Sequence, residues 1–231
     1  MGIFDRHKAK VAARDAEHAR AEQQSALDAW THRDELMADA LELAKNGGST
    51  ESGSLILKKG EEVFLIGEGM GLVEPRRLPG HWVGRSQGVS FHIAKGLNYR
   101  VGASRGTFQQ GDEVVTPIDF GTATITNHRV VFQGQKSSRE WAFAKLLGFQ
   151  HDPERPITYL QVSNREKVSG ILYDDAGAEM VRLRLTVALA REDGDASEAI
   201  PGLEAELAEH RASRPSLEPI DELPQPTGEH S

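Results

Sequence analysis

The sequence predicts an α+β protein that is mainly β. It predicts a β-rich body at residues 55–192, preceded by a long N-terminal helix and followed by a short helix and an acidic tail. Three observations support this: the first 46 residues are rich in helix formers, the middle has short alternating apolar runs between glycine and aspartate turns, and the end is rich in proline and acids. Regularly spaced short strands favour an antiparallel barrel or sandwich over alternating βαβ units.

Residues 1–46 form the predicted N-terminal helical arm, because no glycine or proline occurs between Lys8 and Lys45. Its second half carries an apolar stripe at heptad spacing that Asp34 interrupts, namely Leu27, Trp30, Met37, Leu41 and Ala44. A polar helix of this length needs a partner to be stable, so the stripe either packs on the body or pairs with a second chain. We expect a coiled coil that makes the protein a homo-oligomer.

Residues 47–54 are rich in glycine and serine and predict a flexible linker. Beyond it, Leu55-Ile-Leu and Val63-Phe-Leu-Ile are the first apolar runs of the β-rich body. The clearest local signal is a hairpin at residues 121–134. A two-residue turn at Asn127 and His128 sets a register that gathers apolar residues on one face, pairing Ile125 with Val130 and Ala123 with Phe132.

Asn127 also favours a hairpin turn with positive φ, which asparagine tolerates better than other non-glycine residues. Near the end of the body, residues 179–191 are ambiguous. Their strict alternation favours a strand, whereas their length and position favour a closing helix. Residues 193–231 predict a short helix at 197–211 and a disordered tail from Pro215 onward.

The hairpin also carries a family resemblance. The pattern Asp119-x-Gly121-x-x-x-Ile125-Thr126-Asn127-x-Arg129-Val-Val-Phe132-x-Gly134, followed by Glu140-Trp141, resembles bacterial pleckstrin-homology-like domains of the GRAM type. The longer span 74–190 looks like a family of uncharacterised actinobacterial proteins. The resemblance implies a bent β-barrel-like sandwich closed by a helix, so we assign residues 179–191 to that helix. It also implies a module that binds anionic lipid headgroups, peptides or protein partners, and no catalysis.

Charge is unevenly distributed along the chain, whose formal net charge is −8. Residues 193–231 alone hold 10 acidic and 2 basic side chains, so the acidity belongs to the tail and the body is slightly basic. The chain has no cysteine, a mean hydropathy of −0.47 and no signal-peptide pattern. We therefore expect no transmembrane segment, and a cytoplasmic protein that attaches peripherally to the membrane.

A basic stretch at residues 76–111 is the strongest functional candidate. It contains six cations, no acid and several interleaved aromatic residues. Arginine suits phosphate groups because it offers a planar fork of donors. Four cations form the predicted site for an anionic ligand: Arg85, Lys95, Arg100 and Arg105. The ligand is an anionic lipid or a protein partner. A nucleic-acid-binding accessory protein is the alternative that the net charge of −8 disfavours, and solvated strand faces are the purely structural interpretation.

Enzymatic chemistry has little support in the sequence. Gly84-Arg-Ser86-Gln-Gly88 fits the pattern of a hydrolase nucleophile elbow, but alternating strand-like residues follow it where a helix is required. The histidines lack metal-ligand spacing, and no cofactor motif occurs. We therefore expect a non-catalytic binding or scaffold module without metal or cofactor.

Overall fold

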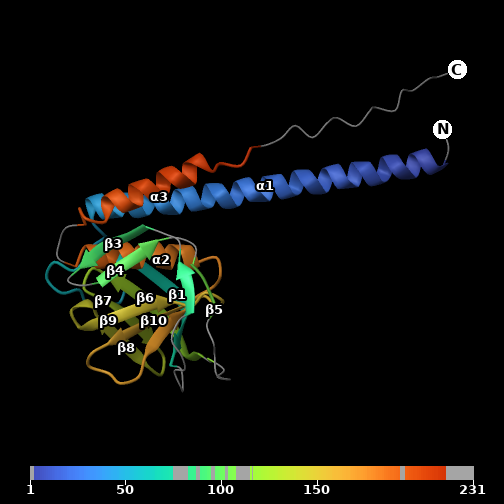
Figure 1. The fold of residues 1–231 in the computed structure, drawn as a ribbon. Helices are drawn as coiled ribbons and strands as arrows, with labels where there is room; N and C mark the ends of the chain where they lie inside the picture. The colour runs from blue at the N-terminus through green and yellow to red at the C-terminus, as the bar shows by residue number, and fades with distance from the viewer. Residues whose placement is uncertain are drawn as a thin grey trace. The chain divides into compact units, whose positions relative to one another are not determined.

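The computed structural model describes residues 3–74, 83–86, 89–94, 97–101, 104–107, 115, 117–192 and 196–216. Most of the predicted tail, residues 217–231, therefore lies outside the described residues. The chain divides into two compact units, Met1–Glu35 with Ala208–Ser231, and Leu36–Leu207. The long helix α1 (Ile3–Asn46) and the short helix α3 (Ile200–Ala212) confirm the two predicted terminal helices, and each contributes residues to both units (Figure 1).

The larger unit contains a seven-stranded antiparallel sheet, as expected for a mainly β protein. Its strands lie in the order β8-β7-β6-β1-β11-β10-β9. Their bounds are β1 (Val63–Val73), β6 (Pro117–Thr126), β7 (Arg129–Gly134), β8 (Ser138–Ala142), β9 (Leu146–His151), β10 (Ile157–Val162) and β11 (Ser169–Leu172), with the short 3-10 helix η1 (Phe143–Lys145) between β8 and β9. The first strand is therefore central, with β6 on one side and β11 on the other.

An irregularity in β1 lets this strand serve both halves of the sheet. Its register against β6 shifts between Gly67 and Met70, and Gly69 has a φ of +69°. A Cβ at Gly67 would overlap the end of the buried Met70 side chain, so any larger residue here would force that side chain to move. Beyond the bulge, Gly71 to Val73 pair with β6 and β11 at once. The glycines at 67–71 thus have a structural explanation.

The predicted hairpin is confirmed between β6 and β7. Ala123 lies opposite Phe132 and Ile125 lies opposite Val130, and all four side chains are fully buried. The predicted turn with positive φ is wrong, because no non-glycine residue of the described chain has positive φ.

Side-chain hydrogen bonds explain why the turn needs no left-handed residue. The Thr126 hydroxyl accepts hydrogen bonds from the backbone N–H groups of His128 (3.2 Å) and Arg129 (3.0 Å). The Asn127 side chain accepts from the Glu62 N–H at 2.8 Å and donates to the Gly60 carbonyl at 3.1 Å. Asn127 therefore fastens the turn to the preceding loop, a role that local sequence patterns do not reveal.

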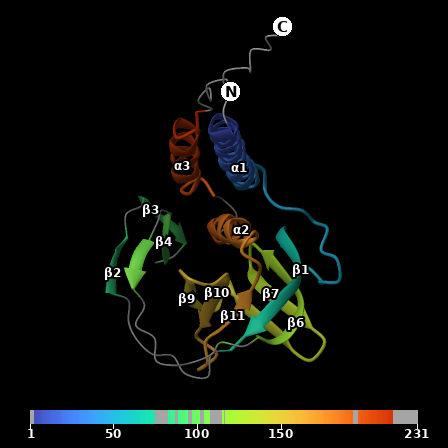
Figure 2. The same ribbon diagram turned by 90° about the vertical axis from the view of Figure 1, so that its right-hand side faces the viewer.

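Residues 179–191 form a helix, as the resemblance implied: α2 spans Ala178–Ala190. Most of its side chains from Val181 onward are buried, and it lies against β1 and β6 (Figure 2). A surface helix has apolar residues on one side only, spaced three and four residues apart. Helix α2 is buried on nearly all sides, so its sequence does not show this spacing. The intervening Arg182 and Arg184 are neutralised by carboxylates, Arg182 by Glu179 and Glu206 and Arg184 by Asp39.

The predicted apolar stripe of α1 packs within the chain. In the larger unit, Met37 and Ala44 are buried in the same core as α2, together with Leu203 and Leu207 of α3. In the smaller unit, the Trp30 ring stacks on His210 at 4.9 Å and donates its Nε1–H to the His210 carbonyl. Of the two roles considered for this stripe, packing on its own chain is therefore the one observed.

Residues 47–62 connect α1 to β1 along the sheet. Ser49, in the predicted linker, exchanges backbone hydrogen bonds of 2.8 and 2.7 Å with Val63, and Ser54 contacts Gln133 of β7. The run Leu55-Ile-Leu is not a strand, contrary to the prediction of a β-rich segment there. Leu55 is buried and Ile56 is 88% exposed, because the chain crosses the sheet at this point and does not pair with it.

A buried ion pair joins this crossing segment to the hairpin. Arg129 donates to both carboxylate oxygens of Glu61, at 2.7 and 3.0 Å, and also to the Ile56 carbonyl and to Glu140 of β8. The Glu61 side chain is fully buried and also accepts from the Thr126 hydroxyl at 2.8 Å. Burial alone would raise the pKa of Glu61, but hydrogen bonds from Arg129 hold that pKa below its usual value.

Breaking this pair should be costly, because the remaining charge stays buried without a partner. We expect Glu61→Leu or Arg129→Met alone to lower the free energy of unfolding by about 3–5 kcal/mol, and the double variant to recover most of the loss. Urea unfolding followed by circular dichroism measures all three. Lys58→Met is the control, since its pair with Glu140 is exposed and contributes about 1 kcal/mol or less. Single variants no worse than this control would contradict the assignment.

Candidate functional site

The predicted cations lie in an insertion between two neighbouring strands of the sheet. Val73 at the end of β1 pairs with Pro117 at the start of β6. Residues 74–116 therefore leave the sheet and return to it at the same point. The insertion contains two two-stranded sheets: β2 (Val83–Ser86) pairs with β5 (Ser104–Thr107), and β3 (Val89–Ala94) pairs with β4 (Leu97–Val101). Here the structure describes the backbone, and it places β3 against α2.

Two of the four predicted cations lie directly opposite each other. The β2–β5 register pairs Arg85 with Arg105, with Gly84 opposite Gly106 and Ser86 opposite Ser104. Arg100 of β4 is separate from this pair and lies opposite Ser90. Lys95 lies outside the described residues. The structure thus brings Arg85 and Arg105 together and assigns Arg100 to a different small sheet.

The Arg85–Arg105 pairing has an electrostatic consequence. Directly opposed residues of an antiparallel pair share one face of the sheet, about 4.5–5.5 Å apart, and like charges there destabilise the sheet. No acidic residue occurs between residues 76 and 111 to neutralise them. Glu74, the first residue of the insertion, is engaged by Arg139 at 2.5 Å. An anion between the two guanidinium groups would convert this repulsion into attraction.

The sequence alone reveals these arginines, but it does not show that they lie opposite each other on paired strands. The signal was present as mirrored triplets, Gly84-Arg-Ser86 and Ser104-Arg-Gly106, which an antiparallel pairing superimposes residue for residue. Three mirrored residues are too few to predict that the two segments pair.

Ser86 does not have the setting of a hydrolase nucleophile. It ends β2, and the next described element is strand β3, whereas the elbow requires a helix directly after the serine. Within the described part of the chain, no three His, Cys, Asp or Glu side chains gather as a possible metal site. No described helix is long and apolar enough to cross a bilayer.

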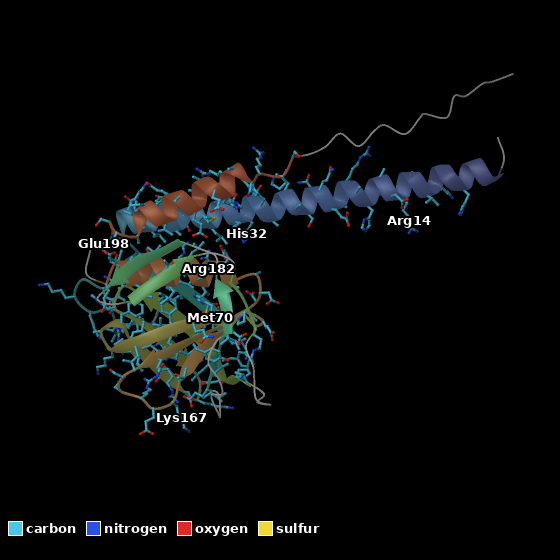
Figure 3. All side chains as sticks on the ribbon, in the orientation of Figure 1. Arg14, His32, Met70, Lys167, Arg182 and Glu198 are labelled. Atoms are coloured by element: carbon cyan, nitrogen blue, oxygen red, sulfur yellow. The ribbon has the colours of Figure 1, made fainter. Side chains whose placement is uncertain are left out.

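A second polar feature, a hydrogen-bonded chain across β9 and β10, was not foreseen. Thr158 lies 2.8 Å from His151 Nδ1 and 2.8 Å from the Tyr173 hydroxyl. The pKa of His151 is lowered to about 4, mainly by burial and in addition by the positive charge of Arg182 on α2, which Figure 3 labels. His151 is therefore neutral at physiological pH and adds no charge to the basic surface.

The depressed pKa of His151 predicts a stability that depends on pH. The folded pKa lies below the unfolded value near 6.5, so this contribution is complete above pH 6.5 and is lost as the pH falls toward 4. The loss should reach about 3 kcal/mol. Urea unfolding at several pH values measures it, and His151→Asn, which keeps an acceptor or donor near Nδ1, should flatten the slope between pH 4.5 and 6.5. An unchanged slope in that variant would contradict the assignment.

Comparison with models of protein families, with curated proteins and with solved structures finds no match. Any function assigned to this chain therefore depends on its own residues and their geometry.

Proposed function

We propose that this protein is a non-catalytic binding module that presents the Arg85–Arg105 pair to an anionic lipid surface. The observation that carries the proposal is the direct opposition of two arginines on β2 and β5, in a stretch with no acidic residue. Lipid phosphates offer the oxygen acceptors that guanidinium groups bind in pairs. The protein would be cytoplasmic and attach peripherally to the membrane.

The fold supports a pleckstrin-homology-like interpretation of the body. Its antiparallel sheet has the first strand at the centre, and a helix follows the last strand and packs on the sheet. This fits the bent, helix-closed sandwich that the sequence resemblance implies. Such a scaffold tolerates a long insertion between β1 and β6, because the Val73–Pro117 pairing closes its base.

Exposed apolar side chains next to the insertion favour a lipid surface over a nucleic acid. Ile118 and Phe120 follow Pro117 in β6 and are 44% and 56% exposed. They alternate with the buried Asp119, whose carboxylate accepts from the N–H groups of Lys136 and Ser137 at 2.8 Å each. Asp119 thus anchors the strand while its neighbours face outward. Apolar and aromatic side chains near cations suit the interface of a bilayer. Binding to a nucleic acid depends largely on neutralising its phosphates and gains little from exposed apolar side chains.

Vesicle co-sedimentation of the full chain tests the proposal. We expect salt-sensitive binding to vesicles of phosphatidylcholine with phosphatidylserine and weak binding to pure phosphatidylcholine. Arg85→Glu with Arg105→Glu should weaken binding by about 30-fold or more, because each cation near such a surface contributes about 1 kcal/mol. Lys145→Glu with Lys167→Glu makes the same charge change on exposed lysines outside the insertion, and Figure 3 labels Lys167.

The outcomes of this test separate the possible partners. Equal loss in both double variants would assign binding to overall charge and not to the Arg85–Arg105 pair. Equal binding to neutral vesicles, or none to either, would exclude the lipid surface. Binding to duplex DNA in a mobility-shift assay at low salt, without vesicle binding, would favour the nucleic-acid alternative.

The exposed apolar residues should contribute a component of binding that salt does not screen. We expect Phe120→Ser to weaken vesicle binding about fivefold at every salt concentration, because inserted apolar area is not subject to ionic screening. Thr122→Ser, a conservative change on the same strand, is the control. An effect that disappears at high salt would show that Phe120 acts through the electrostatic contacts.

A further inference from the structure

We propose that a second copy of this chain pairs with the N-terminal stretch of α1, residues 3–28, in the antiparallel direction. The inference concerns the helical arm and is independent of the proposed binding of anions. It also differs from a coiled coil along the whole arm, because the apolar stripe nearer the body already packs within its own chain.

Among the residues that the structure describes, the outer part of α1 has no buried side chain to stabilise it. None of the described side chains between residues 7 and 26 is buried, and Val11 is 47% exposed. The polar contacts of this stretch, His18 with Glu22 and Gln24 with Asp28, join residues four apart in the same helix. Figure 3 labels Arg14 on this stretch. A long helix without a packing partner is marginal in water, so a partner would stabilise it considerably.

The sequence provides a narrow face suited to another helix. Positions 9, 12, 16, 19 and 26 are all alanine, at alternating spacings of three and four residues with Gln23 completing the pattern. Continued toward the body, the same spacing reaches Met37, Ala40 and Ala44, which are buried. Small residues at heptad positions allow two helices to approach closely.

Charge identifies the partner and its direction. Residues 3–14 contain four basic and one acidic side chain, whereas residues 15–28 contain four acidic and one basic. Parallel pairing of two copies would oppose like charges along the whole stretch. In antiparallel pairing, the basic residues 3–14 of each copy lie opposite the acidic residues 15–28 of the other copy.

A second copy fits this surface better than an unrelated partner of one charge. A uniformly acidic or basic helix would match one half of the stretch and repel the other half. The chain is its own complement under a two-fold axis between residues 15 and 16, which gives the isologous interface typical of dimers.

Sedimentation equilibrium of the full chain tests the pairing. We expect a dimer whose dissociation constant rises with salt. Lys10→Glu with Arg14→Glu leaves residues 3–14 with three acidic and two basic side chains, so both halves of the stretch become net acidic. This should weaken the dimer about tenfold or more. Adding Glu17→Lys and Glu22→Lys to the same chain reverses both halves and should restore the dimer. A monomer in the unmodified chain, or no restoration by the fourfold variant, would overturn the proposal.

The direction is tested by distances between spin labels. The chain has no cysteine, so a single cysteine accepts one label per copy. With Ala13→Cys, near the axis, the two labels should lie roughly 10 Å apart. With Ala26→Cys they should lie roughly 32 Å apart, since the helix rises 1.5 Å per residue. Short distances at both positions would establish parallel pairing and overturn the proposal. Vesicle binding is measured separately, so its failure would leave this result intact.

Discussion

The buried ion pair between Glu61 and Arg129 holds together three parts of the body. Arg129 begins β7, Glu61 precedes β1, and the same guanidinium group reaches the Ile56 carbonyl and Glu140 of β8. Charges removed from water are tolerated only when their hydrogen-bonding groups are satisfied, and here the Thr126 hydroxyl completes the set. The crossing segment at residues 55–62 and the hairpin turn therefore form as one unit.

The sheet carries a long insertion at a point where two neighbouring strands pair. Pairing of β1 with β6 continues up to Val73 and Pro117, so the insertion is attached at a point that the sheet already defines. Within this insertion, residues 76–111 contain six cations and no acidic residue. The arginine of the hairpin, Arg129, is paired with carboxylates inside the fold. Arg85 and Arg105 lie opposite each other in the β2–β5 register, where we propose that an external anion binds.

The sequence allowed the register of the β6–β7 hairpin to be predicted, because a period of two leaves only one way to gather Ala123, Ile125, Val130 and Phe132 on one face. The turn conformation could not be predicted, because Asn127 acts through contacts with residues 60 and 62, far away in sequence. Local propensity does not contain such long-range polar contacts.

In helix α2, the local sequence pattern favoured the wrong secondary structure. Its alternating pattern favours a strand, whereas its length, its position and the family resemblance pointed to a helix. The pattern is compatible with a helix because the chain buries α2 on several sides and supplies carboxylates to Arg182 and Arg184. For the candidate site, composition was sufficient to find the cations. Their mutual position depends on the pairing of segments about twenty residues apart, which composition does not specify.

Nuclear magnetic resonance of the isotopically labelled full chain tests the central claim most directly. Titration with nanodiscs that contain phosphatidylserine should shift or broaden the backbone amide signals of residues 83–86 and 104–107 first, and nanodiscs of phosphatidylcholine alone should leave them unchanged. Changes confined to other parts of the body, or equal changes with both kinds of nanodisc, would contradict the assignment of the Arg85–Arg105 pair as the anion-binding element.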